Sequence, residues 1–207
     1  MQELQSKDDQ EINWKRLGAF AVGFALLLLV YRYFTDTITA KSSTKKIYES
    51  AWSEHTLGID SSILISSPVD FAHKVIDPSS TGFPSLIAAE SYQYQSYGNI
   101  EIMLNLMLYQ DNEAPTLEGA ADGSLHEVEH IQGIQQLEYI EDKLTKNNVE
   151  GIHQHGTFVL QAVKYHFSNT IFMVDHKMWQ LSLTYASEDD YAKQIADRMV
   201  NSFTVKP

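Results

Sequence analysis

Two histidines separated by three residues form the pattern in this chain with the most direct chemical meaning. The segment His126-Glu-Val-Glu-His130 has the spacing of zinc-binding helices, in which both imidazoles ligate the metal and Glu127 activates the bound water. The longer form of that motif has a third ligand at the position of Gln136, a poor zinc ligand, and Glu129 places an acid beside the metal face. Two exposed histidines on an acidic surface helix are therefore the favoured interpretation, and a zinc metallohydrolase using His126, Glu127 and His130 is the alternative.

A second histidine pair, His153 and His155, alternates along a predicted strand, so both side chains are expected on one face. A divalent metal would bind there only if a third donor converged on the pair. A partly exposed strand face is the simpler interpretation. The chain has no cysteine, no glycine-rich phosphate loop and no spacing typical of a catalytic triad. We therefore predict no catalytic, cofactor-binding or metal-binding residue and no cofactor.

Tyr92, Tyr94 and Tyr97 could line a ligand groove, but packing within a sheet is the more common use of aromatic residues in strands. The acidic run over 188–190 follows Ser187 at the start of a predicted helix, where a cap and negative charge are favourable. That run is interpreted as part of the helix cap and not as a cation site.

An apolar run over residues 17–34 predicts a single membrane-spanning helix. At about 1.5 Å per residue the run is about 27 Å long, slightly shorter than a hydrocarbon core of about 30 Å. Trp14 and Tyr33 suit the two membrane interfaces. A cleaved signal peptide is the competing interpretation, but Ile38 stands where a cleavage site needs a small residue.

The anchor divides the chain into a polar tail over 1–16, the helix over 17–34, a tether over 35–57 and a soluble domain over 58–207. Basic residues flank the helix in nearly equal numbers, so the basic-inside bias does not set its orientation clearly. A short tail before a single span is typical of a signal anchor. The domain is thus expected in the periplasm or outside the cell, and a cytosol-facing domain is the alternative.

The negative charge of the chain belongs to its soluble part. The whole chain carries a net charge of −12, and basic and acidic residues balance within residues 1–41. An acidic surface repels phosphate backbones and anionic headgroups, which argues against nucleic acid as a partner. The remaining length is sufficient for one well-packed core. A protein partner fits this charge better, whereas the sequence assigns no small-molecule ligand.

Hydrophobic periodicity predicts a mixture of strands and helices. A short strand begins at residue 62 and ends at Pro68, and a hairpin over 91–110 turns at Gly98-Asn99. Three more strands, over 151–167, 170–176 and 179–185, are predicted to turn at Ser168-Asn169 and Lys177.

Two helices complete the predicted domain. The first follows a loop over 111–124 and runs from 125 to 143, with Ser124 and Glu127 as a capping box. The second begins after Ser187 and presents an apolar stripe, formed by Tyr191, Ala192, Ile195, Ala196, Met199 and Phe203.

This order of elements resembles the PsbP-like family of α/β/α sandwiches, which includes Ran-binding and bacterial envelope relatives. The residues that carry the resemblance are Val149-Glu-Gly151, the strand Trp179 to Tyr185, the acidic helix start and Asn201-Ser-Phe203. The resemblance implies an antiparallel sheet with helices on both faces, in an α+β domain. It also implies a role in binding, assembly or chaperoning and carries no catalytic residue. The sequence thus predicts a membrane-anchored binding or assembly module whose partner is another envelope protein.

Overall fold

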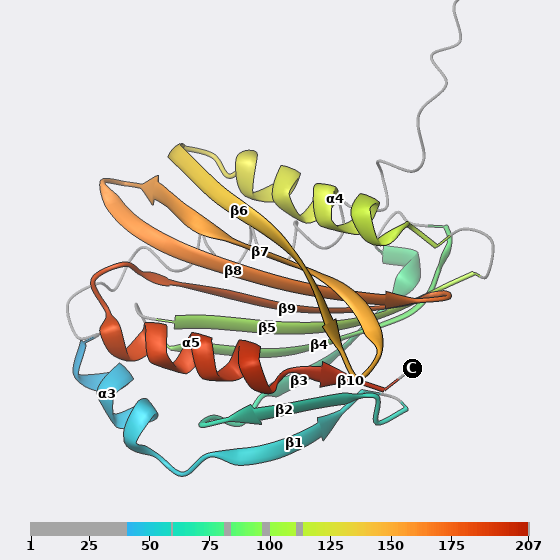
Figure 1. The fold of residues 1–207 in the computed structure, drawn as a ribbon, viewed down its shortest axis with the longest axis horizontal. Helices are drawn as coiled ribbons and strands as arrows, with labels where there is room; N and C mark the ends of the chain where they lie inside the picture. Colours follow the sequence, from blue (N-terminus) through green and yellow to red (C-terminus); the bar gives the residue numbers. More distant parts are fainter. Residues whose placement is uncertain (1–40, 59, 81–83, 97–99, 111–113, 207) are drawn as a thin grey trace, which may run out of the picture.

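The computed structural model describes residues 41–58, 60–80, 84–96, 100–110 and 114–206 (Figure 1). The predicted membrane-spanning helix over 17–34 and the side chain of Tyr97 lie outside these ranges. Within them, no helix combines the length and the apolar character needed to cross a membrane.

Antiparallel strand pairing builds the main sheet of the domain. The seven strands, in spatial order, are β3 (Ala72–Ile76), β4 (Leu86–Ser96), β5 (Ile100–Tyr109), β9 (Lys177–Ala186), β8 (Val163–Val174), β7 (Val149–Leu160) and β6 (Ile134–Lys146). The β4–β5 hairpin confirms the hairpin predicted over 91–110. Strand β6 forms one edge of the sheet, and its pairing with β7 contains a bulge between Gln135 and Glu138.

Helices cover both faces of this sheet, as the α+β prediction requires (Figure 1). Helix α4 (Leu117–Glu129) packs against β7 and β8 on one face. Helix α5 (Asp190–Ser202) lies on the other face with helix α3 (Lys41–Glu49), and a 3-10 turn, η1 (Pro78–Ser80), follows β3. A small antiparallel sheet lies beside α5 and consists of β1 (Ser53–Leu57), β2 (Ile63–Ser67) and β10 (Thr204–Val205).

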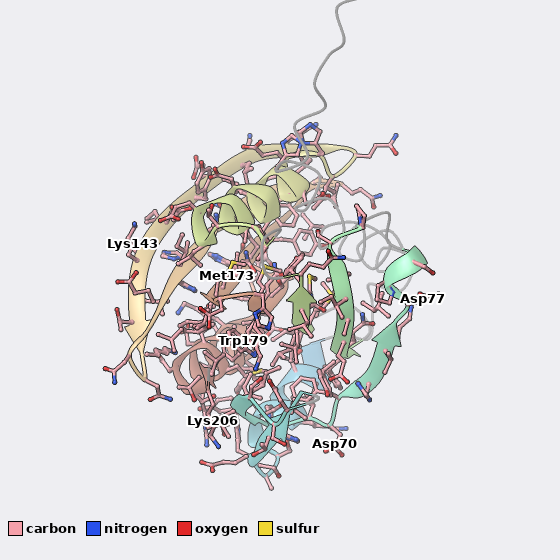
Figure 2. All side chains as sticks on the ribbon, turned by 90° about the vertical axis from the view of Figure 1, so that its right-hand side faces the viewer. Asp70, Asp77, Lys143, Met173, Trp179 and Lys206 are labelled. Atoms are coloured by element: carbon pink, nitrogen blue, oxygen red, sulfur yellow. The ribbon has the colours of Figure 1, made fainter. Side chains whose placement is uncertain are left out.

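The largest apolar cluster lies between the main sheet and α5. Trp179 is at its centre (Figure 2), fully buried, and its indole N–H donates to Ser62 Oγ at 2.7 Å. This bond joins the main sheet to the start of β2. The predicted apolar stripe of the last helix is confirmed, because Ala192, Ile195, Ala196, Met199 and Phe203 are all buried in this cluster.

Amide side chains form a buried polar network on the opposite face, beneath α4. Asn169 Nδ2 donates to Ser124 Oγ at 2.7 Å and to Gln154 Oε1 at 3.1 Å. Gln180 Nε2 donates to Ser124 Oγ and to Asn169 Oδ1, which also accepts a hydrogen bond from Ser182. Buried amides need such partners, so this network fixes how α4 sits on the strands.

The helix predicted over 125–143 is wrong at both ends. Helix α4 begins earlier, where Thr116 Oγ1 accepts from the backbone N–H of Gly119, and Ser124 lies inside the helix instead of capping it. Small buried residues form much of the early part of α4, so the apolar pattern there was weak. Gly133 adopts a φ of +87°, which no helix contains, and the chain then enters β6.

The turns of the predicted three-strand meander are also displaced. The chain turns at Gln161-Ala162 and at Asp175-His176, whereas Ser168 and Asn169 lie within β8. Gln161 and Ala162 both have positive φ angles, 50° and 65°, although neither is a residue type that favours this conformation. The sequence therefore contained no turn signal at this point.

Two predicted boundaries near the ends of the domain change as well. The tether expected over 35–57 contains α3 and β1, and Tyr48 of α3 packs against Tyr191 of α5 with ring centroids 5.6 Å apart. The final helix is capped by Asp189 and not by Ser187. Asp189 Oδ1 accepts from the backbone N–H groups of Tyr191 and Ala192, which confirms that the acidic run is part of a helix cap.

Glu101 on β5 is an unusual feature of this core. Its side chain is 4 % exposed, and Oε1 has no hydrogen-bond partner among the described residues. Burial raises the pKa of this carboxyl from 4.5 to about 8. Between these values the unfolded chain releases the proton and the folded chain keeps it, so stability is expected to fall as pH rises from 4.5 to 8.

We expect the free energy of unfolding of Glu101→Gln to depend less on pH, between 4.5 and 8, than that of the unmodified chain. Relative to the unmodified chain, the variant should gain on the order of a few kcal/mol in unfolding free energy between pH 4.5 and pH 8. Urea unfolding across this pH range measures the difference, and Glu54→Gln at an exposed position of β1 is the control. Parallel curves for Glu101→Gln and the unmodified chain would contradict the assignment.

Candidate binding groove

An open groove of about 920 Å³ lies between β6, β7, β8 and α5. We call it the β6–α5 groove. Apolar side chains line much of it. Three histidine rings also line the groove, and charged side chains of β6 and α5 lie along it. The lining residues used below are Ile140, Asp142, Lys146, His153, His155, His166, Ser168, Tyr185, Lys193 and Asp197.

The long β6–β7 hairpin creates one wall of the groove. Asn147 and Asn148 form its turn with φ angles of 52° and 63°, the left-handed conformation that asparagine tolerates well. Gly156 of β7 lets β6 pass very close, since a Cβ atom there would lie 2.1 Å from the carbonyl oxygen of Glu138. Both features allow β6 to follow the twist of the main sheet, and α5 covers the centre of that sheet.

Lys146 closes one end of the groove by joining β6 to the end of α5. Its ammonium group donates to the carbonyl oxygens of Val200, Asn201 and Phe203 at 2.5, 3.2 and 3.0 Å. These carbonyls belong to the last turn of α5 and to its C-cap residue, Phe203, where the helix dipole favours a cation. Burial lowers the pKa of Lys146. The bonds hold the two walls of the groove at a fixed separation.

Strand register brings the three histidines of the groove to one face of the sheet. His153 lies opposite Asp142 and Thr170, and its Nδ1 is 2.9 Å from Thr170 Oγ1. The rings of His153 and His155 lie 5.0 Å apart, as their predicted alternation requires. His166 belongs to the next strand and stacks on Tyr185 at 5.3 Å.

Burial makes the groove a neutral aromatic surface more than an ionic one. Desolvation is the main cause that lowers the pKa of both His153 and His166, so these rings are uncharged at neutral pH. Burial, with a smaller contribution from Asp197, raises the pKa of Tyr185 to about 12. Lys193 and Asp197 on α5 form an ion pair at 2.6 Å. The groove thus offers apolar area and neutral hydrogen-bonding groups.

Ser168, His155 and Asp142 lie on three neighbouring strands of the groove and have the residue types of a hydrolytic triad. His155 Nδ1 is 3.9 Å from Asp142 Oδ2, which is too long for a hydrogen bond, and Ser168 Oγ has no hydrogen-bond partner among the described residues. Ser168 lies in the middle of a paired strand, so nearby backbone N–H groups face the ladder and do not converge on an oxyanion site. The arrangement does not support acyl transfer.

The sequence motif at 126–130 lies elsewhere, at the exposed end of α4. Its two histidine rings are 3.9 Å apart, but Glu127 is 5 % exposed and lies on the buried side of the helix. Glu129 lies with the histidines instead, as expected, and Gln136 is in β6. His153 and His155 belong to no group of three metal donors within the described ranges.

The tyrosines of the β4–β5 hairpin within the described ranges, Tyr92 and Tyr94, make packing contacts. Tyr92 is buried, donates to Glu90 Oε2 at 2.8 Å and stacks on His73 at 4.6 Å. Tyr94 packs against the main apolar cluster. These contacts agree with a packing role for both residues.

Sequence reasoning missed three important groups of the groove: Lys146, His166 and Asp197. They come from three elements and meet only through strand register and the packing of α5. The asparagine pair after Lys146 was the only local signal, because a two-residue turn defines which residues close a hairpin.

Comparison with known proteins identifies the fold of this chain. No family model and no curated protein matches this chain. The solution structure of cyanobacterial PsbP (CyanoP) from Synechocystis sp. PCC 6803 superposes with a TM-score of 0.54 at 12 % identity, covering 76 % of this chain and 94 % of that chain. LpqN, involved in cell envelope biogenesis of Mycobacterium tuberculosis, gives a TM-score of 0.45 at 12 % identity, over 78 % and 95 % of the two chains.

The domain is therefore an α+β sandwich built on one antiparallel sheet. Its fold is PsbP-like, which confirms the resemblance inferred from the sequence.

Lys146→Met is expected to lower the free energy of unfolding by about 1–3 kcal/mol, because a charged donor to three carbonyl groups is removed. Thermal or urea unfolding measures this loss. Lys143→Met is the matched control: Lys143 belongs to the same strand (Figure 2), its side chain is 79 % exposed, and it forms an ion pair with Glu118 of α4. The control should change stability within about 0.5 kcal/mol. Equal effects of the two variants would contradict the role given to Lys146.

Proposed function

We propose that this protein is a non-catalytic binding module, held at a membrane by the helix predicted over 17–34, that captures a segment of another envelope protein in the β6–α5 groove. The observation that carries the proposal is the groove itself, which is open, largely apolar and bounded by fixed walls. Its volume of about 920 Å³ is at the upper end of the range typical of ligand sites.

The chemistry of the groove favours a polypeptide with apolar side chains. Ile140 is 59 % exposed on β6, so an apolar partner would remove its side chain from water. The nearby neutral imidazoles of His153 and His166 can exchange hydrogen bonds with peptide groups. The acidic character of the domain disfavours phosphate-rich partners.

An anchor would increase the strength of such binding without adding contacts. A domain confined to the layer next to a membrane meets partners of the same layer at a raised effective concentration. Modest affinity in the groove is then sufficient for capture. This arrangement needs no cofactor.

Two alternatives make different predictions. A zinc metallohydrolase would need Glu127 beside His126 and His130, and the burial of Glu127 counts against it. A cytosol-facing adaptor would use the same groove, and only its topology differs from the proposed arrangement.

Site-specific cross-linking tests the groove. A photoreactive phenylalanine analogue in place of Ile140 should cross-link a partner in the native host, and the same probe in place of Val75 should not. Both side chains are exposed, at 59 % and 67 %, but Val75 lies on β3 at the other edge of the sheet. Adding Lys146→Met should reduce the cross-link, whereas Lys143→Met should leave it. Equal products from positions 140 and 75 would contradict the proposal.

Cysteine labelling tests the topology, because the chain has no cysteine of its own. Glu54→Cys, at an exposed position of the domain, should react with a membrane-impermeant maleimide in intact spheroplasts. Gln5→Cys, in the N-terminal tail, should react only after lysis. The opposite pattern would support the cytosol-facing alternative, and recovery of the whole chain in the soluble fraction would contradict the anchor.

A further inference from the structure

Three donor side chains converge at the exposed end of α4, on the other side of the main sheet from the groove. One ligand atom from each of His126, Glu129 and His130 lies within 4.8 Å of the other two. His126 Nδ1 is 4.0 Å from Glu129 Oε2, and all three residues are exposed. Residues spaced by three and four positions share one face of a helix, which explains why the three side chains meet.

The backbone at the end of α4 orients one of these donors. His130 is the C-cap residue, with φ −95° and ψ 4°, so its side chain still lies above the previous turn. His130 Nδ1 is 2.7 Å from the carbonyl oxygen of His126. A carbonyl can only accept, so Nδ1 carries the proton, and the neutral ring has its lone pair on Nε2. A hydrogen bond of this kind is the usual way in which proteins orient a metal-binding imidazole.

The distances suit a small cation with borderline-soft character. In tetrahedral zinc sites the ligand atoms lie about 2.0–2.1 Å from the metal and hence about 3.3 Å from one another. The largest separation is at most 4.8 Å, so reaching this value needs a movement of at most about 1.5 Å, which exposed side chains can make by small rotations. Two imidazoles and one carboxylate are a donor set that zinc accepts, with water completing the shell.

We propose that His126, Glu129 and His130 form a surface site for one divalent transition-metal ion, and zinc is the metal used to test it. The site differs from the hydrolytic motif in its third donor, because Glu129 takes the place beside the histidines and Glu127 remains buried. It is independent of the groove, so the failure of either proposal leaves the other intact. All three protein ligands come from the C-terminal end of α4, so the metal would bind at the surface of the folded domain.

Zinc titration of the full chain in detergent, purified without a histidine tag and treated with chelator, tests the site. We expect one zinc ion per chain, measured by competition with a chromophoric chelator. His130→Gln and Glu129→Gln should each weaken binding by on the order of tenfold or more. His153→Gln is the matched control from the other histidine pair and should leave the affinity unchanged. Absence of saturable binding, or equal loss in His153→Gln, would overturn the proposal.

Cobalt substitution separates this site from the hydrolytic one. Co²⁺ should give d–d absorption bands that change in Glu129→Gln and persist in Glu127→Gln. Bands lost in Glu127→Gln and retained in Glu129→Gln would show that the metal uses the other glutamate and would overturn the assignment. Circular dichroism of each variant verifies that α4 is still folded.

Discussion

The hydrogen bonds of Lys146 are the interaction on which the shape of the β6–α5 groove depends. A half-buried ammonium group reaches three carbonyl oxygens at the end of α5, and it does so from the last residue of an edge strand. Leaving these carbonyls without a donor would be unfavourable, so the strand and the helix cannot separate independently. The asparagine turn that follows sets the register of the hairpin. Lys146 thus closes one end of the groove and sets the separation of its two walls.

Elements could be predicted from the sequence wherever the local hydrophobic pattern agreed with the tertiary contacts that the segment makes. The hairpin between Tyr92 and Leu108 follows strict alternation, and the stripe of α5 follows helical spacing, so both could be predicted. The segment from Ile134 to Ile140 repeats apolar residues every three positions and suggested a helix. Pairing with β7 overrides this preference, and Gly133 ends the helical path with a backbone conformation of its own.

The candidate site was predictable only in part, for a related reason. His153 and His155 share a strand, so their common face follows from the alternation of a strand. His166 was assigned to that same strand, where its even position would place it on the opposite face. The unsuspected turn at Gln161-Ala162 reverses the chain and returns His166 to the groove. One missed turn therefore concealed a third of the histidines in the groove.

The exposed edge of β6 has a consequence for how copies of this protein behave at high density. A strand of thirteen residues with an unpaired side is a template on which another chain can extend the sheet. Here the bulge at Gln136 interrupts the flat edge, and four exposed charges follow it, on Glu138, Glu141, Asp142 and Lys143. Both devices disfavour edge-to-edge growth into fibres. The strand can therefore border an open groove and still remain resistant to self-association.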